Sequence, residues 1–223
     1  MRKLFEQELK ELLEELEILG RMVDDQWGKT MQALQTGDVK LAAEVVRGDR
    51  EIDNKEQELE RECLSLIALQ QPMAKDLRTI AACLKVLTDV EREGDQCADV
   101  SEILCTGGIN AESPLMRDIL EMLEVSRGMF RRAMEVFLTR DVQEAEEICR
   151  MDDVVDNLFA KVIRDAAEGL PSSTNAMGEV DLLLIAKYAE RMGDHATNIA
   201  EWVIYIETGT HPDLNHSEEG IPE

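Results

Sequence analysis

The chain has 223 residues, of which 48 are acidic and 24 basic, so its formal charge at neutral pH is −24. This charge repels phosphate backbones and no local basic patch offsets it, so we expect no nucleic-acid partner. Five cysteines without metal-finger spacing, and no apolar run of about 18 residues, favour a reduced cytoplasmic protein without direct membrane insertion. Aromatic residues make up only 4%, which favours helices over strands.

Apolar periodicity and punctuating residues divide the chain into six predicted helices. Leu9, Leu12, Leu16 and Leu19 form the apolar stripe of a long first helix, and Pro72 ends the second helix because proline cannot continue one. The predicted helices run to about Gln35, from Asp38 to about Gln70, from about Met73 to Cys105, from Pro114 onward, from Asp141 to about Gly169, and from about Gly178 to Glu207.

Helix-capping residues mark several of these starts. Gly37 stops the first helix, and Asp38 is placed to cap the second. Asp141 followed by Glu144 is similar to a capping box, in which each side chain satisfies a backbone N–H of the other. Ser113 is expected to cap the fourth helix, with a proline as its first residue.

The sequence repeats itself with a period near 100 residues. Shifting by 103 lays Thr36–Val39 on Thr139–Val142, and shifting by 99 lays Glu91–Asp95 on Glu190–Asp194. This period is the size of a small domain and too long for a solenoid repeat. We therefore predict an all-α chain of two tandem antiparallel three-helix bundles related by internal duplication. The bundles would span residues 1–107 and 108–209, followed by a disordered tail at 210–223.

The repeated residues include four pairs of carboxylates spaced i, i+4, which places each pair on one helix face. Like charges at this spacing destabilise a helix by roughly 0.2–0.5 kcal/mol per pair, so the recurrence of these pairs requires an explanation. The simplest reason is a solvated acidic face. The alternative is that antiparallel neighbouring helices bring the pairs together as an oxygen-donor cluster that a cation would neutralise. The pairs are Asp49 with Asp53, Glu91 with Asp95, Asp152 with Asp156, and Glu190 with Asp194.

Carboxylate oxygens suit Mg²⁺, Ca²⁺, Mn²⁺ or iron, and argue against copper or a structural zinc site. Asp99 and Glu102 continue the first acidic face, as Asn198 and Glu201 continue the second. Glycines at positions 94 and 193 lie inside predicted helices, where each costs about 1 kcal/mol relative to alanine. They predict a close approach to the backbone, by a neighbouring helix or by a ligand.

The run Glu190–Glu201, of sequence ERMGDHATNIAE, resembles the signature of the PhoU family of phosphate-transport accessory and regulatory proteins. Residues 91–102 are a weaker echo of it, the Asp49/Asp53 and Asp152/Asp156 pairs resemble the family's other acidic motif, and the resemblance covers about residues 1–208. Gln96 stands where the second copy has His195, so the two sites are expected to differ. We expect His195 to hydrogen-bond a carboxylate rather than to bind metal.

The resemblance implies a negative regulator of the phosphate-starvation response. The implied partners are a sensor histidine kinase, the ATPase subunit of the phosphate ABC importer and a second copy in a homodimer. It also implies divalent or trivalent metal ions on the carboxylate clusters, with iron the first expectation and Mn, Mg, Ca or Zn left open. The implied ligands are Asp49, Asp53, Glu91 and Asp95 in the first cluster, and Asp152, Asp156, Glu190 and Asp194 in the second.

Two alternatives compete with this adaptor. A carboxylate-bridged di-metal enzyme would need Glu-x-x-His motifs, and the chain has none. Phosphate-binding loops and nucleophile elbows are also absent from the sequence, so we do not expect an enzyme. A metal-free helical scaffold predicts that neutralising the carboxylates leaves partner binding unchanged.

Overall fold

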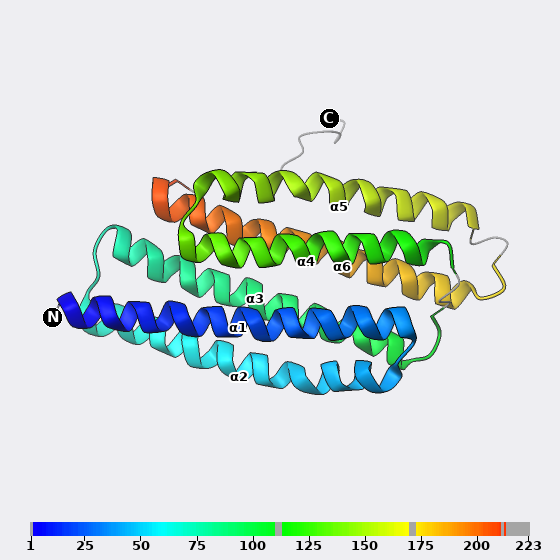
Figure 1. Ribbon diagram of the computed structural model, residues 1–223, viewed down its shortest axis with the longest axis horizontal. Helices are drawn as coiled ribbons and strands as arrows, with labels where there is room; N and C mark the ends of the chain where they lie inside the picture. Colours follow the sequence, from blue (N-terminus) through cyan, green and yellow to red (C-terminus); the bar gives the residue numbers. More distant parts are fainter. Residues whose placement is uncertain (1, 110–112, 170–172, 211, 213–223) are drawn as a thin grey trace, which may run out of the picture.

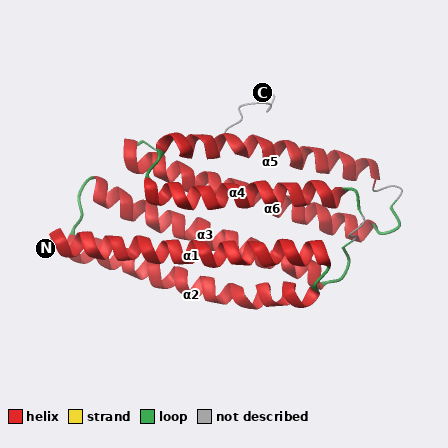
Figure 2. Cartoon of the chain, viewed as in Figure 1, coloured by secondary structure: helices red, strands yellow, loops and turns green. Residues whose placement is uncertain are grey.

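The computed structural model describes residues 2–109, 113–169, 173–210 and 212, and within them the chain forms six α-helices and no strand (Figure 2). The predicted all-α class is confirmed. The helices are α1 (Arg2–Thr36), α2 (Val39–Gln70), α3 (Lys75–Cys105), α4 (Leu115–Thr139), α5 (Val142–Gly169) and α6 (Ala176–Thr208).

Consecutive helices run antiparallel and form two three-helix layers, α1–α3 and α4–α6 (Figure 1). The layers meet mainly where α3 packs against α6, with a smaller contact between α1 and α4. Buried apolar side chains of both bundles form one connected core. Across the described residues, none of the helices combines the length and apolar character that a bilayer crossing requires.

Apolar spacing explains why α1 packs as it does. Leu12, Leu16, Leu19 and Val23 are all almost fully buried, so they form the stripe that faces α2 and α3. Burial of one such side chain contributes about 1.5–3 kcal/mol, which is ample to hold a helix in place against its neighbours. The predicted apolar stripe of the first helix is confirmed.

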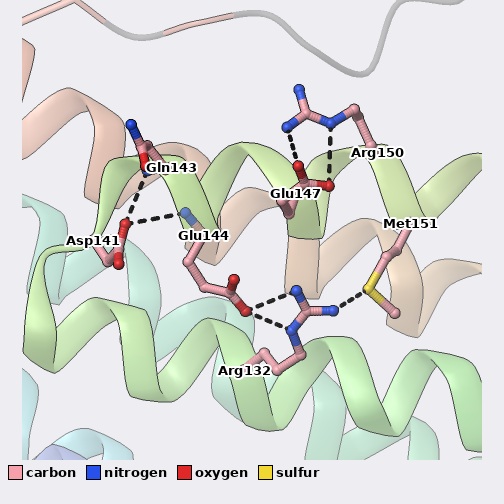
Figure 3. A network of polar contacts seen from close by, with 7 residues as sticks. All are labelled: Arg132, Asp141, Gln143, Glu144, Glu147, Arg150 and Met151. Atoms are coloured by element: carbon pink, nitrogen blue, oxygen red, sulfur yellow. Dashed lines mark hydrogen bonds and ion pairs between the residues drawn. The ribbon is translucent and has the colours of Figure 1, made fainter.

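The predicted caps of α2 and α5 form, but only one half of the capping box does. The Asp38 carboxylate accepts hydrogen bonds from two backbone N–H groups at the start of α2. Asp141 does the same for α5, accepting from the backbone nitrogens of Gln143 at 3.0 Å and Glu144 at 3.1 Å (Figure 3). The Glu144 side chain turns instead to Arg132 of α4, whose Nε donates to it at 2.7 Å. This ion pair ties α5 to the preceding helix.

Three helix starts differ slightly from the predictions. α3 begins at Lys75 rather than Met73 because Ala74 has a positive φ of 50°, which is incompatible with a helix. α4 begins one residue after Pro114, with the Ser113 hydroxyl accepting from the backbone N–H of Leu115.

α6 begins at Ala176, two residues before the predicted start, because the Asn175 side chain caps it by accepting from the backbone N–H of Gly178. The helices otherwise end within a residue of the predicted positions. The predicted tail, 210–223, lies almost wholly outside the described residues, and the domain boundaries stay predictions.

Candidate functional site: two acidic clusters

The eight predicted carboxylates lie in two groups, one in each bundle. We call the first acidic cluster the group in which α2 faces α3, and the second acidic cluster the group in which α5 faces α6. The first consists of Asp49, Asp53, Glu91 and Asp95, and the second of Asp152, Asp156, Glu190 and Asp194. In each, the carboxylates from one helix raise the pKa of carboxylates on the other, so the expected convergence occurs.

The first acidic cluster brings three ligand atoms together. Asp49, Asp53 and Asp95, all half-buried, can each offer a carboxylate oxygen within 4.8 Å of the other two. Asp49 Oδ1 is buried and has no hydrogen-bond partner among the described residues. Burial, followed by the charges of Asp53 and Asp95, raises the pKa of Asp49 to about 6. Burial, followed by the charge of Asp95, raises the pKa of Glu91 to about 7.

An arginine lies beside the first cluster but does not neutralise its negative charge. Arg92 is exposed and lies 3.1 Å from Asp95 and 3.6 Å from Glu91, measured from guanidinium nitrogen to carboxylate oxygen. Exposed pairs of this kind contribute about 0–1 kcal/mol. Asp99 and Glu102, predicted to continue this face, also raise the pKa of Asp49. Negative charge therefore remains in excess at this site.

The second acidic cluster has similar electrostatics and looser geometry. Burial and then the charges of Asp194, Asp156 and Glu190 raise the pKa of Asp152 to about 7. Burial and then Glu190 raise the pKa of Asp194 to about 6. Lys187 forms an ion pair with Glu190. Within the described part of the chain, only the trio of the first cluster gathers three ligand atoms within 4.8 Å.

Both predicted close-packed glycines stand beside the clusters. A Cβ on Gly94 would lie 3.2 Å from two methyl carbons of Ile52 and 3.5 Å from Asp49 Oδ1. A Cβ on Gly193 would lie 3.1 Å from Asp152 Oδ1. The predicted close approach is confirmed, and the approaching group is the neighbouring helix. Each glycine therefore lets an aspartate lie close against the backbone of the facing helix.

His195 is adjacent in sequence to the second cluster but turns toward the other bundle. Its Nδ1 lies 2.9 Å from Oδ1 of Asp89 on α3, and the same oxygen accepts from Asn198 Nδ2 at 3.2 Å. The expected hydrogen bond between His195 and a carboxylate is confirmed. The expectation that Asn198 continues the second acidic face is wrong, because its side chain reaches across the α3–α6 interface. Sequence reasoning missed Asp89, since Tyr188 occupies its repeat position.

Two three-helix bundles in tandem, with carboxylates recurring on the second and third helix of each, define a duplicated helical protein with a repeated acidic site. The family profile described as "PhoU domain" matches residues 16–104 and 119–203, once in each bundle. The chain therefore belongs to the PhoU family.

Similar proteins have closely matching lengths. The phosphate-specific transport system accessory protein PhoU homolog of Clostridium acetobutylicum is 32% identical, over 96% of this chain and 99% of that protein. The homolog of the same description from Caulobacter vibrioides is 35% identical, over 93% of this chain and 91% of that protein. These relatives are named as accessory proteins, which agrees with the expectation that the chain is not an enzyme.

Solved structures agree with the fold. The crystal structure of PhoU from Pseudomonas aeruginosa has a TM-score of 0.87 and 28% identity, covering 92% of this chain and 100% of that one. A phosphate transport system regulatory protein PhoU from Streptococcus pneumoniae also has a TM-score of 0.87, at 24% identity and over 94% of this chain and 99% of that one. The latter likeness supports the fold alone.

Proposed function

We propose that this chain is a metal-binding regulatory adaptor of phosphate uptake and of the phosphate-starvation response. The observation that carries the proposal is the recurrence of the acidic cluster, with its adjoining glycine, in both bundles. Membership of a family whose curated relatives are named accessory proteins of phosphate-specific transport supports the adaptor role.

The residues present fit a hard cation. Carboxylates within 4.8 Å of one another match the separation of ligands that share one ion, given metal–oxygen distances of roughly 2.0–2.6 Å. Among these three residues, Asp49 has a buried carboxylate oxygen without a hydrogen-bond partner in the described part of the chain. A bound cation would supply positive charge that offsets the repulsion among the carboxylates. Iron is our first expectation, and Mn, Mg, Ca or Zn are the alternatives.

The metal ligands we propose are the eight clustered carboxylates. In the first cluster Asp49, Asp53 and Asp95 provide the core of the site, with Glu91 beside them. In the second the ligands are Asp152, Asp156, Glu190 and Asp194. Because one carboxylate is able to bridge two metal ions, the proposal allows more than one ion in each cluster.

The regulatory part of the proposal names two protein partners. We propose that the chain contacts a sensor histidine kinase and the ATPase subunit of the phosphate importer, and that these contacts repress the starvation response. A cytoplasmic location and a homodimer complete the proposal. The acidic surface favours partners that present basic patches, since complementary charges steer association.

Metal content tests the site directly. The protein, purified without chelators or an affinity tag, is compared by elemental analysis with a variant carrying Asp53→Asn, Asp95→Asn, Asp156→Asn and Asp194→Asn. A matched control carries Glu44→Gln, Glu121→Gln, Glu135→Gln and Glu168→Gln, which are exposed and outside the clusters. We expect metal in the parent and control and its loss from the helical cluster variant. Equal, negligible metal in all three would support the metal-free scaffold.

Gene deletion tests the regulatory role. We expect a strain lacking the protein to express alkaline phosphatase in high phosphate, where the parent represses it. Complementation with the cluster variant then separates metal binding from regulation. Unchanged phosphatase output in the deletion strain would refute negative regulation.

A further inference from the structure

A groove of about 650 Å³ lies between α1 and α2, away from both acidic clusters. These two helices run side by side and antiparallel, so the N-terminal half of α1 forms one wall and the C-terminal half of α2 the other (Figure 1). The lining residues on α1 are Glu8, Glu11 and Glu15, and those that matter on α2 are Lys55, Glu58, Arg61, Glu62, Leu66 and Leu69.

Two leucines are among the residues that line the groove. Leu66 is buried, whereas Leu69 is 80% exposed. An isolated exposed leucine is ordinary on a protein surface, but this one lines a cavity. The volume of the groove falls within the range of about 300–1,000 Å³ that is typical of binding pockets.

The walls of the groove are predominantly anionic. Five glutamates and only two cationic side chains line the groove, and both cationic side chains already have partners within the chain. Lys55 lies 2.8 Å from Glu15 and 3.1 Å from Glu58, and the Arg61 Nε donates to a backbone carbonyl of its own helix. Burial, followed by the charge of Glu58, raises the pKa of Glu62. The groove therefore attracts positive charge.

The second bundle does not reproduce these walls. With the repeat shift of 103, Glu58 corresponds to Lys161 and Glu15 to Asp118. Lys161 and Asp118 form an ion pair with each other, so a lysine replaces one of the two glutamates that flank Lys55 in the first bundle. The anionic groove is thus a property of the first bundle and not a requirement of the duplicated fold.

We propose that this groove binds a basic amphipathic helix of a partner protein. A groove between two antiparallel helices accepts a third helix, whose apolar residues at i, i+3 and i+4 would cover Leu66 and Leu69. Lysine or arginine residues flanking that stripe would face the glutamates. A second copy of this chain, with its charge of −24, and anionic lipid are both repelled by the same walls. The inference rests on the proposed adaptor role in requiring a protein partner.

Peptide binding tests the groove. The probe is a fluorescent peptide of about 14 residues, with leucines on one helical face and lysines on the other, and its scrambled isomer has the same composition. The groove variant carries Glu11→Gln, Glu58→Gln, Glu62→Gln and Leu69→Ser. The control variant carries Glu121→Gln, Glu135→Gln, Glu168→Gln and Leu184→Ser, and so loses equal charge and one exposed leucine on other helices.

We expect the amphipathic peptide to bind the parent at least about tenfold more tightly than the groove variant, and the control to differ from the parent by less than about twofold. Equal weakening in both variants, or equal binding of the scrambled peptide, would overturn the proposal in favour of unspecific charge attraction. A shift in sedimentation for the groove variant alone would instead make this face an interface between copies.

Elemental analysis of the same samples separates the two proposals. We expect the groove variant to keep any metal that the parent holds, because none of its substitutions touches a cluster. Loss of peptide binding with unchanged metal content supports the groove whatever the metal result in the parent. Absence of metal in every sample refutes the metal sites and leaves the groove measurement intact.

Discussion

The two bundles share an acidic exterior and differ in their interiors. In the first bundle, the Trp27 indole donates a hydrogen bond of 3.1 Å to Glu93, and both side chains are fully buried. The repeat positions in the second bundle hold Phe130 and Met192, also fully buried and entirely apolar. Burial raises the pKa of Glu93 well above its ordinary value, because a low-dielectric interior favours the neutral acid.

The same contrast recurs one turn away. Thr30 lies 3.3 Å from Ser101, oxygen to oxygen, in the first interior, whereas alanines occupy both repeat positions in the second. The buried pattern has therefore diverged while the clustered carboxylates recur at every repeat position. The carboxylates are not a by-product of core packing, which strengthens the case that they share a role.

The clusters should respond alike to pH, and this is the largest effect we expect. Four carboxyls, two in each cluster, have pKa values of about 6 or 7 in the folded chain, against 3.8 for aspartate and 4.5 for glutamate. Their contribution to stability is complete below the unfolded values and is lost as pH rises through 6 to 7. The free energy of unfolding of the metal-free protein should therefore fall from pH 5 to pH 8.

Denaturation at several pH values, with each cluster neutralised separately, checks this prediction. Asp49→Asn with Glu91→Gln, and Asp152→Asn with Asp194→Asn, should flatten the pH dependence by similar amounts. A flattening confined to one pair would show that the two clusters are not electrostatically equivalent.

The interiors should respond differently to substitution. Trp27→Phe leaves the Glu93 carboxyl without its donor and should lower the free energy of unfolding by about 2–4 kcal/mol. Adding Glu93→Met imitates the second bundle and should recover most of that loss, because both polar partners are then replaced. Glu93→Gln, which keeps an acceptor for Trp27, serves as the control and should stay within about 1 kcal/mol of the parent. A double variant no more stable than Trp27→Phe would contradict this reading.

Substituting alanine for each of the two glycines should distinguish a role in helix packing from a role in placing a metal ligand. Gly94→Ala pushes against Ile52, which is buried and has little room to retreat, and should cost about 1 kcal/mol net of the helix-propensity gain. Gly193→Ala meets the half-buried carboxylate of Asp152, which is able to rotate, so stability should change by less than about 0.5 kcal/mol. Metal titration should show the larger loss for Gly193→Ala, and the opposite ranking in both measurements would count against these roles.

The last prediction concerns one of the hydrogen bonds between the bundles. His195→Gln removes the contact with Asp89 and should lower the free energy of unfolding by about 1 kcal/mol. Glutamine is the replacement because it occupies the repeat position in the first copy. Metal content should not change. Loss of metal from the second cluster in this variant would show that His195 is a ligand after all.

Much of the fold follows from local signals. The leucine stripe of α1, the caps at Asp38 and Asp141, and the repeat together predict six helices in two bundles, because each depends on residues close in sequence or on direct self-similarity. The late start of α3 escaped prediction, since nothing local marks Ala74 for a positive φ. Glu144 fits a capping box by spacing, yet a stronger partner, Arg132, lies on the adjacent helix.

The residues of the candidate sites were likewise only partly predictable from the sequence. Spacing and duplication predicted all eight clustered carboxylates, because matching positions recur in both copies. Asp89 corresponds to Tyr188 and Glu58 of the α1–α2 groove corresponds to Lys161, so comparison of the two copies does not reveal them. Their roles arise only when α3 meets α6 and α1 meets α2 in space.

The single core that joins the two bundles bears on how the molecule comes apart. Besides apolar contact, Arg127 of α4 donates to Asp24 of α1 at 2.7 Å, and Arg78 of α3 donates to a backbone carbonyl near the end of α6 at 3.2 Å. Neither bundle can melt without exposing apolar surface of the other. We therefore expect the duplicated halves to unfold as one cooperative unit, so that heating gives one transition in which both halves lose their helices together.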